Sequence, residues 1–570
     1  LGTSNSSVGV YYNDSVYIIK NDIGSTLTPS FIAFTDDQKA LIGDAARSQQ
    51  FQNVTNTVFG VKRIIGRKFT EQEVQEDLKY FPYTIISDQD NNCVVEVMQN
   101  GQKRQYSPVQ LSALLLEQLK QTAQDFLKQE ITQAVITVPA YFNDAQRRAT
   151  QEAAQIAKLN VLRIINEPTA ACISFAYRNK QKLDFVMVYD LGGGTFDCSI
   201  VKVTDQAFDV IATQGNSHLG GEDVDNKLLN YFQQEIKKKT GQDVFMNYKA
   251  GRRLKAACEA AKKLLSDQHQ IQLEIENLFD GVDYVLQLSR AKLEELIEPL
   301  IKQTLLHCDR CLADSKLSKQ QLDVVLIGGQ TKTPRVAYLV QEWLGKDLLK
   351  CKIPDEAVAF GATLQAQSLF NSNFKKFQLN DVCPLSLGIE TSSHQMSVLI
   401  PRNSQIPCQK RQVFTTFAEN QKSVTIKIYE GEKRLCKENH FLNQFELQLE
   451  LNPRQRIEIL YEIDVDGILT VTAKDEKHEK SISINSKSIG RLEKAVAGQS
   501  PSQFSLIRQF EQSLLQLYNE ILEGAQENKQ LIQAEINKQL EWVQQNLNSD
   551  DKVVQEQWNW FNNIKNQMMQ

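Results

Sequence analysis

The spacing of hydrophobic residues changes twice along the chain, and the first regime covers residues 1–370. Short apolar runs alternate there with amphipathic stretches. The run at 134–140 predicts a strand, the stretch at 143–159 predicts a helix, and the run at 184–190 predicts another strand. Strands that alternate with helices are typical of α/β layers around a largely parallel sheet. The first regime therefore indicates an α/β domain.

The second regime begins near residue 382, where apolar and polar residues alternate with period two. The segments at 423–430, 445–451 and 456–473 follow this pattern. The dipeptide Asp466-Gly467 separates two such runs and predicts a type I′ hairpin. The pattern as a whole predicts an antiparallel β-sandwich of about 100 residues.

A helical period follows after about residue 490. Ser500-Pro501 opens a stretch with apolar residues at steps of three and four, and two further helices follow it. The members of the first set are Ile507, Phe510, Leu514, Leu517 and Ile521. Packing of a small helical bundle explains these positions, so the order of regimes is α/β, then β, then α.

Length and charge exclude several classes of protein. A chain of 570 residues is too long for one core, and a net charge of -5 does not favour nucleic acid or anionic membrane as a partner. No run approaches the roughly 18 apolar residues of a membrane span, and no signal peptide is visible, which favours a cytoplasmic location. Cys308 and Cys311 form a lone C-x-x-C, which we interpret as one face of a helix rather than a metal site.

A glycine-rich loop at 190–197 carries the most informative chemistry. Three consecutive glycines allow backbone amides to approach an anion closely, and Thr195 adds a hydroxyl donor. Asp190 and Asp197 flank the loop, where they could hold a hydrated Mg²⁺. A glycine-rich hairpin with capping aspartates is the alternative. The sequence at 2–4 resembles a second, weaker cradle, and the doubling suggests two related lobes with a cleft between them.

Neither loop matches the Walker A or the dinucleotide-binding pattern, so phosphoryl transfer needs a cation from elsewhere. Lys62 is the best candidate. Because Arg63 follows it directly, a solvated surface pair is the interpretation that the residues alone favour.

Several longer segments occur together in a recognisable order. They lie at 1–10, 56–69, 135–150, 161–171, 189–197, 218–226, 354–362, 381–391 and 429–435. With these segments the chain resembles the 70-kilodalton heat-shock (heat-shock cognate) chaperone family over essentially its whole length, as a divergent cytosolic-type member. The resemblance implies an actin-like, two-lobed α/β ATPase domain, an antiparallel β-sandwich and a C-terminal helical lid.

The resemblance also implies domain boundaries and a function. The nucleotide-binding domain would cover 1–375, the linker 376–381, the β-sandwich peptide-binding domain 382–490 and the helical lid 491–570. The implied function is an ATP-dependent chaperone that hydrolyses ATP slowly, under co-chaperone stimulation, to control the capture and release of extended hydrophobic client segments.

Five residues match the catalytic positions of the family. Lys62 would stabilise the γ-phosphate and orient the attacking water, and this overturns the surface-pair interpretation. Thr195 would lie beside that phosphate. Asp190 would hold Mg²⁺ directly, and Glu167 and Asp197 would reach the ion through water. Positioning and charge stabilisation would supply most of the catalysis.

The implied cofactors are ATP or ADP and Mg²⁺, with K⁺ as a further candidate. The implied nucleotide contacts are Gly2, Thr3, Ser4, Gly192, Gly193, Gly194, Gly220, Gly221, Glu222, Glu259, Lys262, Lys263, Ser266, Gly328, Gly329, Lys332 and Asp355. At this site Lys263, Gln330 and Lys332 stand where the family usually has arginine, serine and arginine. Because an ammonium does not reproduce guanidinium stacking, we expect weakened adenine binding.

The resemblance assigns two further sets of residues. Coupling between domains would involve Pro139, Arg147, Arg163, Asn166, Thr169 and Asp381, some of which would receive J-domain co-chaperones. Peptide contacts would come from Ile389, Ser392, Gln395, Phe414, Phe417, Val424 and Ile426, among which Gln395 replaces a usually apolar residue. Core packing alone is the alternative for the apolar members of this set. Nucleotide-exchange factors complete the implied partners.

The linker departs from the family pattern. Residues 377–380 read Phe-Gln-Leu-Asn where a nearly continuous leucine run is usual. Exchange of two leucines for amides removes at most about 3–6 kcal/mol of burial, so we expect weakened interdomain coupling.

Two other functions are weighed beside the chaperone. One is a weakly cycling structural or regulatory subunit of a larger assembly, such as a cytoskeletal or ciliary one, which the altered linker and adenine contacts motivate. The other, an actin-fold sugar kinase, is disfavoured because such enzymes do not carry this β-domain.

Overall fold

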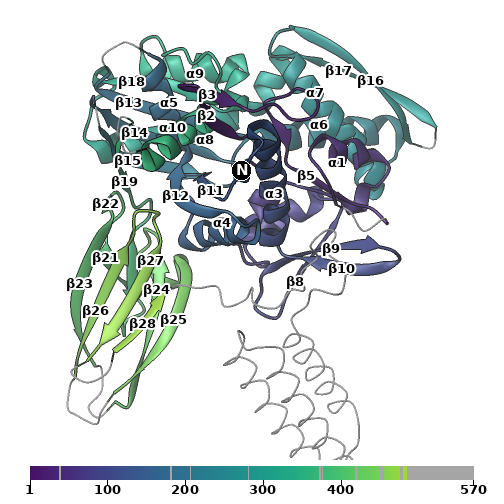
Figure 1. Ribbon diagram of the computed structural model, residues 1–570. Coiled ribbons are helices and arrows are strands. Elements are labelled where there is room, and N and C mark those ends of the chain that lie inside the picture. The colour runs from purple at the N-terminus through teal and green to yellow at the C-terminus, as the bar shows by residue number, and fades with distance from the viewer. Residues whose placement is uncertain are drawn as a thin grey trace, which may run out of the picture. The chain divides into compact units, whose positions relative to one another are not determined.

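The computed structural model describes residues 1–483 except 37–39, 180–182, 206, 280, 372–373, 375–376, 417–420, 450–454 and 476–478. The chain divides into two compact units, Leu1–Glu493 and Lys494–Gln570. The predicted helical lid at 491–570, the end of the predicted β-domain at 490 and the predicted peptide contact Phe417 all lie outside the described residues. All the described residues belong to the first unit (Figure 1).

A six-stranded sheet forms the centre of this unit, in the order β18-β13-β14-β15-β19-β22. Its strands are β13 (Phe185–Leu191), β14 (Phe196–Val203), β15 (Ala207–Asn216), β18 (Leu322–Ile327), β19 (Gln378–Val382) and β22 (Gln405–Ile406). The strand predicted at 184–190 is confirmed as β13. The expectation of a largely parallel sheet is wrong here, because β13, β14 and β15 form an antiparallel meander. The glycine loop between β13 and β14 is too short for a parallel crossover.

Helices cover both faces of this sheet, and β13 shows why. Val186 and Val188 pack in one core cluster with helices α5 (Glu167–Arg178) and α10 (Ala357–Phe370). Met187 and Tyr189 point the opposite way into another cluster. That cluster contains residues of α6 (Gly221–Thr240), α7 (Tyr248–Leu264), α8 (Arg290–Ser315) and α9 (Pro334–Leu344). Alternate side chains of a strand face opposite sides, so a continuously apolar strand requires two covering layers.

Two further strands form a separate sheet. Strands β11 (Gln133–Val138) and β12 (Asn160–Asn166) are parallel and are joined through α4 (Asp144–Ile156). The predicted strand at 134–140 is confirmed as β11, which begins one residue earlier and ends two residues earlier, and the helix at 143–159 is confirmed with shorter ends. Helix α4 begins at a capping box, in which Asn143 Oδ1 accepts from the Gln146 amide at 2.9 Å and Gln146 Oε1 accepts from the Asn143 amide at 3.2 Å.

Smaller elements complete the first 370 residues. The strands are β1 (Asn5–Ser6), β2 (Gly9–Tyr12), β3 (Ser15–Ile18), β4 (Thr28–Pro29), β5 (Phe31–Phe34), β6 (Ala40–Ile42), β7 (Thr57–Phe59), β8 (Thr84–Ser87), β9 (Cys93–Gln99), β10 (Gln102–Tyr106), β16 (Gln270–Phe279) and β17 (Val282–Ser289). The helices are α1 (Asp44–Ser48), α2 (Gln72–Asp77) and α3 (Pro108–Leu127). The short 3-10 helices of this part are η1 (Gln49–Phe51), η2 (Val54–Asn56), η3 (Val61–Arg63), η4 (Leu78–Tyr80), η5 (Val244–Met246), η6 (Lys319–Gln321) and η7 (Gly329–Lys332). A further one, η8 (Cys436–Glu438), follows later in the chain.

Two four-stranded antiparallel sheets follow the linker and share one core. The first contains β21 (Met396–Ile400), β20 (Leu387–Glu390), β24 (Ser423–Glu430) and β25 (His440–Gln448) in that order. The second contains β23 (Cys408–Thr415), β26 (Arg456–Ile463), β27 (Leu469–Lys474) and β28 (Glu479–Ser483). The period-two pattern appears as alternate burial along β26, where Ile457, Ile459, Tyr461 and Ile463 are buried.

The predicted type I′ turn at Asp466-Gly467 is wrong. Ile463 pairs with Leu469, so residues 464–468 form a five-residue connection. Gly467 adopts a positive φ of 79°, and its amide donates to Asp464 O at 3.1 Å. A longer connection is possible because Asp464 Oδ1 also accepts from the amides of Asp466 and Ile468, each at 2.9 Å.

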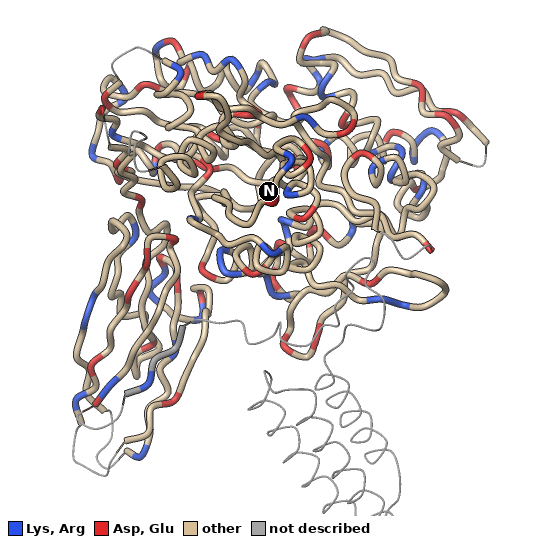
Figure 2. Tube along the Cα trace, in the orientation of Figure 1, with Lys and Arg blue, Asp and Glu red and all other residues tan. Residues whose placement is uncertain are grey.

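The cysteine interpretation agrees with the structure. Cys308 and Cys311 are buried free thiols on α8. Acidic and basic residues are interspersed along the described chain (Figure 2). Within the described residues, no helix combines the length and the apolar character that crossing a membrane would require.

Candidate nucleotide site

A cavity of 1190 Å³ gathers most of the predicted nucleotide residues. Its lining includes the loop at 2–4, the η3 residue Lys62, the start of α5, the loop after β13, the face of α7 and the turn at η7. The predicted residues on its wall are Gly2, Thr3, Ser4, Lys62, Glu167, Asp190, Gly192, Gly193, Thr195, Gly221, Glu259, Lys262, Lys263, Ser266, Gly328, Gly329, Lys332 and Asp355. The cavity also extends between β2 and β11, beneath α3.

The two glycine-containing loops lie directly against each other. A Cβ atom on Gly193 would stand 2.2 Å from Ser4 Oγ, and one on Gly194 would stand 2.6 Å from the Thr3 side chain. Only glycine therefore permits this approach. The two cradles that the sequence suggested belong to one site.

Lys62 is buried in this site. Its Nζ donates to Glu167 Oε1 at 2.5 Å, and it lies 5.6 Å from the centre of the Phe142 ring. Arg63 is also buried and pairs with Asp77 at 3.0 Å and Asp223 at 2.5 Å. The solvated surface pair that the residues alone favoured is wrong, because the neighbouring carboxylates supply partners for both cations.

The carboxylates near Lys62 outnumber the cations that face them. Burial, followed by the charges of Glu167 and Asp197, raises the pKa of Asp190 well above its ordinary value. Burial and Glu167 raise the pKa of Asp197 to about 7, against the opposing effects of the Tyr141 amide and Lys62. Ionising these carboxylates is therefore unfavourable in the empty site, and a bound cation would favour their ionised forms.

This donor set fits hydrated Mg²⁺ better than a metal held by protein alone. Mg²⁺ is usually held by one or two carboxylates, with phosphate and water completing its shell. Among the described residues, no three His, Cys, Asp or Glu side chains are grouped so that they could hold a metal ion by themselves. Asp190 and Glu167, on the cavity wall beside the glycine loops, are the groups that could share the ion with a polyphosphate.

Four predicted site residues do not line the cavity. Gly194 and Gly220 lie behind its wall, where a Cβ atom on Gly220 would be 2.6 Å from the Gly194 nitrogen. Glu222 Oε1 accepts from Ser4 Oγ at 3.4 Å. Asp197 is buried at the start of β14, and its Oδ1 accepts from the Tyr141 amide at 3.0 Å. In this structure these four residues lie behind the residues that form the cavity wall and contact them.

The opposite end of the cavity is built from α6, α7 and η7. Lys262 Nζ pairs with Asp225 Oδ1 at 2.8 Å and donates to Gly221 O at 3.0 Å. A Cβ atom on Gly221 would lie 2.9 Å from Gln330 Oε1, so Gln330 fills the space beside this turn. Sequence reasoning missed Asp225. Its position one turn into α6, four residues after Gly221, is the signal that could have identified it.

The two lysines that replace arginine both have carboxylate partners. Lys263 Nζ lies 2.6 Å from Glu259 Oε1, and Lys332 pairs with Asp355. Burial alone would raise the pKa of Glu259, but Lys263, Arg47 and Lys262 together lower it to about 2. Both ammonium groups are thus held at the cavity wall, and the expected weakening of adenine binding stays a prediction.

Comparison with known proteins identifies the family. The model of the Hsp70 protein family matches residues 1–570. The chain belongs to the Hsp70 family. It is 46% identical over 505 residues to a heat shock 70 kDa protein of Neurospora crassa, a match that covers 87% of this chain and 78% of the relative. It is also 45% identical over 507 residues to heat shock cognate 70 kDa protein 3 of Dictyostelium discoideum, covering 86% and 80%.

Membership of the Hsp70 family indicates the general fold of the protein and the class of ligand that its family binds. The protein is a heat-shock chaperone of a nucleotide-binding family, and its first part is a two-lobed, actin-like domain of mixed α/β content. The roles of individual residues are argued separately below.

Several predicted coupling residues of this Hsp70 chain contact one another. Arg147 Nη2 donates to Asn166 Oδ1 at 2.7 Å and to Ala140 O at 3.1 Å, just beyond Pro139. Thr169 Oγ1 donates to Asp381 Oδ2 at 3.0 Å. Arg163 lies on β12, and its Nε has no hydrogen-bond partner. Apart from Arg163, the structure brings this set together at the base of the linker.

The linker itself is a strand. Leu379 of β19 pairs with Phe208 of β15 in parallel register and is buried. Gln378 is exposed, so a leucine there would bury little surface. Asn380 Nδ2 donates to Asp209 Oδ1 at 2.5 Å. The loss of burial is therefore smaller than the upper bound from the sequence, and weakened coupling stays a prediction.

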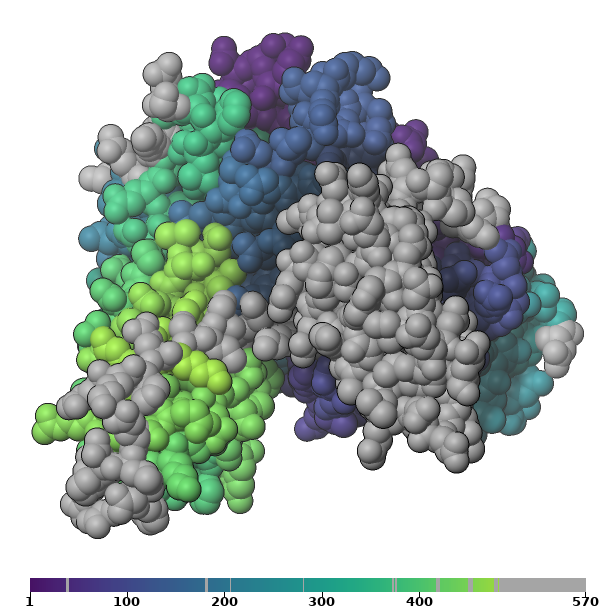
Figure 3. Space-filling model, turned by 60° about the horizontal axis from the view of Figure 1, so that its bottom comes forward, coloured from purple at the N-terminus to yellow at the C-terminus, as the bar shows by residue number. Residues whose placement is uncertain are grey.

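The strands beyond the linker contact the nucleotide-binding part through polar groups that sequence reasoning missed. Asp466 Oδ1 accepts from the Ile164 amide at 2.9 Å, and Asp144 Oδ1 accepts from the Leu469 amide at 2.8 Å. On the central sheet side, Asp314 binds Arg402 at 2.6 Å. The yellow-green surface of the last described strands meets blue surface in Figure 3, in agreement with the first two contacts. No periodicity marks such residues, since each acts with a partner more than 80 positions away.

The predicted peptide contacts occupy two kinds of position. Ile389, Phe414, Val424 and Ile426 belong to or pack on the core shared by the two four-stranded sheets. Ser392 is exposed in the connection between β20 and β21. Gln395 forms an isolated bridge with Leu435. Core packing accounts for the four apolar residues as well as peptide contact does, so their binding role stays a prediction.

Proposed function

We propose that this Hsp70 protein is an ATP-dependent chaperone that hydrolyses ATP to ADP and phosphate in the cavity around Lys62. One observation carries the proposal: two abutting glycine loops meet a buried lysine and an excess of carboxylates at one end of a large cavity. Backbone amides and an ammonium favour polyphosphate, while unbalanced carboxylates favour its cation.

The proposed reaction depends on positioning. The loop amides at 192–194 and the hydroxyls of Thr3, Ser4 and Thr195 would hold the phosphate chain, and Lys62 would stabilise charge on the transferred phosphoryl group. Mg²⁺, when bound, would neutralise phosphate oxygens, with Asp190 as its protein partner and with Glu167 and Asp197 reaching it through water. We expect the adenosine to lie against Lys262, Lys263, Gly328 and Gly329.

Peptide capture would occur in the strands beyond the linker. We propose extended segments of client proteins as ligands, with main-chain bonding along the connection that contains Ser392 and apolar contact near Ile389 and Ile426. The β19 strand supports a link between the two activities, because it is part of the central sheet and leads directly into the client-binding strands. J-domain proteins and nucleotide-exchange factors are the proposed regulators, K⁺ a proposed additional ion, and the cytoplasm the proposed compartment.

Single-turnover hydrolysis of radiolabelled ATP tests the reaction. Lys62→Ala removes the buried ammonium, and we expect the rate to fall about 100- to 1000-fold, as for loss of one preorganised charge-stabilising donor. Lys202→Ala is the matched control, because Lys202 is exposed at the far end of β14. Equal rates for Lys62→Ala and wild type would refute the proposed role.

Client binding needs its own measurement. Fluorescence anisotropy of a labelled, extended apolar peptide should give weaker binding with ATP than with ADP, and the peptide should accelerate turnover. A smaller acceleration than in ordinary family members would support the predicted weak coupling. The comparisons do not favour the alternative of a non-cycling subunit of a larger assembly.

A further inference from the structure

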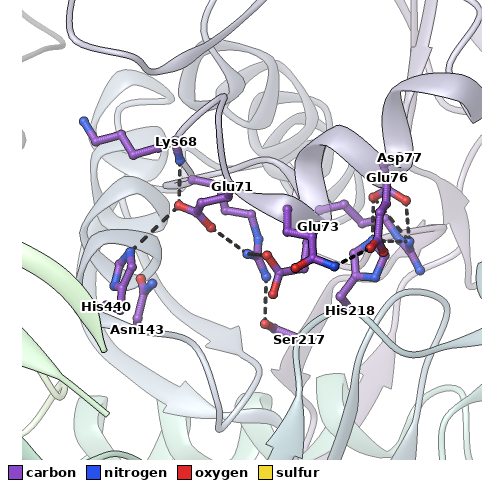
Figure 4. A network of polar contacts seen from close by, with 12 residues as sticks. Lys68, Glu71, Glu73, Glu76, Asp77, Asn143, Ser217, His218 and His440 are labelled. Atoms are coloured by element: carbon purple, nitrogen blue, oxygen red, sulfur yellow. Dashed lines mark hydrogen bonds and ion pairs between the residues drawn. The ribbon is translucent and has the colours of Figure 1, made fainter. Parts of the chain in front are cut away.

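A histidine lies between carboxylates of two different parts of the molecule. His440, at the start of β25, places its Nδ1 2.8 Å from Oε1 of Glu430 on the neighbouring strand β24. Its Nε2 lies 3.8 Å from Oε1 of Glu71, the residue before α2 in the nucleotide-binding part. Figure 4 shows the imidazole directed at Glu71. Each ring nitrogen thus faces an acceptor.

Glu71 is held in place from its own side. Arg67 Nη1 pairs with its Oε2 at 2.7 Å, and the Lys68 amide donates to its Oε1 at 2.7 Å (Figure 4). Arg67 Nη2 also donates to Ser217 Oγ at 2.9 Å. These bonds fix the carboxylate towards the interface. Burial would raise the pKa of Glu71, but His440, Lys68 and Arg67 lower it, so it stays ionised.

The position of the ring between two carboxylates favours its doubly protonated form. A neutral imidazole donates from one nitrogen alone, whereas both nitrogens here face carboxylates. Glu430 is buried, and an unpaired buried carboxylate is costly. Burial alone would lower the pKa of His440, but Glu430 and Glu71 raise it to about 10.

Other charged and titratable groups interact with Glu71 or Glu430, or with the residues beside them. From the nucleotide-binding part come Arg67, Lys68, Glu73, Tyr141, Asp144, Arg148 and Arg310, and from the strands beyond the linker come Cys383, Arg402, Glu430 and Glu432. The pKa of Asp144 is raised, as is that of His440, because burial raises it to about 6 against the opposing charge of Arg148. Asp144 also accepts from the Leu469 amide across the interface, and it titrates at a lower pH than His440.

We propose that docking of the β20–β28 strands on the nucleotide-binding part is linked to proton uptake, with His440 as an imidazolium that bridges Glu71 and Glu430. The bridge is specific to the docked arrangement, because Glu71 belongs to the nucleotide-binding part and His440 to the strands beyond the linker. Falling pH strengthens docking and rising pH weakens it. This linkage concerns the docking equilibrium and does not require that ATP be hydrolysed.

The sign of the linkage follows from the raised pKa. Undocking removes Glu71 but keeps Glu430, so the undocked pKa lies between the ordinary value of about 6.5 and the docked value. The stabilisation from His440 is complete below the undocked pKa and is lost as pH rises through the docked value of about 10. Between these limits the docking constant falls by up to about tenfold per pH unit.

The test measures docking of the full chain between pH 7 and pH 9, above the titration of Asp144. Dyes on unnatural amino acids at the exposed positions Lys103 and Glu462 would report docking by energy transfer. The nucleotide condition is chosen so that docked and undocked molecules are both populated. We expect the wild-type docking constant to fall steadily with pH. A flat wild-type profile would overturn the proposal.

Three variants separate proton linkage from simple packing. His440→Gln should dock more weakly at pH 7 and lose the pH slope. His440→Lys carries a charge throughout the range, so it should dock with a reduced slope and recover part of the strength lost in His440→Gln. His394→Gln is the matched control, because exposed His394 pairs with Glu390 of its own sheet at 2.6 Å. The proposal fails if His440→Gln keeps the wild-type slope, or if His394→Gln loses it equally.

Discussion

The nucleotide cavity and the domain interface both contain buried charges, but they balance those charges differently. In the cavity, Lys62 pairs with Glu167, and the nearby cations do not offset the burial of Asp190 and Asp197. At the interface each acid has a partner across or along the contact: Asp314 has Arg402, and Asp144 has Arg148. The cavity therefore needs a cationic ligand to balance its carboxylates, whereas the acids at the interface already have partners within the protein. We therefore expect the behaviour of the cavity to depend mainly on its ligands, and docking at the interface to depend mainly on geometry and protonation.

The largest effect should come from filling the contact between the two glycine loops. Gly193→Ala places a Cβ atom 2.2 Å from Ser4 Oγ, so the loops must separate. We expect a loss of roughly 1–3 kcal/mol in the free energy of unfolding, typical of overpacking, and a large loss of ATP affinity. Urea unfolding and nucleotide titration would measure these.

Gly192→Ala is the control for this change. Its nearest neighbour would be Thr195 O at 3.7 Å, an ordinary contact. Without nucleotide it should unfold within about 1 kcal/mol of wild type, since a residue other than glycine is tolerated where no strain arises. Equal destabilisation by both variants would show that the close approach of Ser4 is not the reason for glycine at position 193.

An intermediate effect should follow from opening the interface at Asp314. This carboxylate accepts from Arg402, Asn403 and Gln214 at 2.6, 3.1 and 3.0 Å. Asp314→Ala leaves these donors without their carboxylate acceptor. We expect the free energy of docking to become less favourable by about 1–3 kcal/mol, while ATP binding changes little. The energy-transfer pair described above would measure it.

Asp309→Ala provides the comparison on the same helix. Asp309 accepts from Trp343 Nε1 at 2.8 Å within the nucleotide-binding part. Its loss should leave docking unchanged. If Asp309→Ala undocked the strands as strongly, the effect of Asp314→Ala would have to be assigned to α8 as a whole rather than to the interface.

The smallest effect concerns the adenine end of the cavity. Lys332→Arg restores the guanidinium that the family usually has there, and it can keep the pairing with Asp355. Stacking of a cation on an aromatic ring is worth about 0.5–1 kcal/mol at an exposed site, so ATP affinity should rise two- to fivefold, roughly. Isothermal titration would detect this, with exposed Lys350→Arg as control. Unchanged affinity would argue that Lys332 does not limit adenine binding.

Local sequence patterns were sufficient to predict individual strands and helices. The strand at 184–190 and the helix at 143–159 depend on periodicity and on a cap within a few residues, which is information the chain carries locally. The parallel sheet was predicted wrongly, because the pairing partner of a strand is not local. The turn at Asp466-Gly467 was missed for a related reason: Asp464 supports a longer connection, and Asp466 itself binds Ile164 of a distant strand.

Family motifs identified the nucleotide residues by number, and the tertiary structure decided how they act together. Sequence alone named Lys62, Asp190 and the glycine loops, but it placed Lys62 among surface residues until the resemblance was considered. Only the fold shows that Glu167, 105 positions away, neutralises it. Burial, and with it every pKa shift, depends on which elements pack together.

The interface depended on the tertiary structure entirely. His440, Asp314 and Asp466 have no sequence pattern that marks them, since their partners are distant in the chain and each contact is a single polar pair. Composition and hydrophobic period determined the kinds of layers that this protein has, because burial of apolar surface follows a repeat of two or 3.6 residues. The meeting of two layers through a few polar groups follows no repeat, and three-dimensional packing alone decides it.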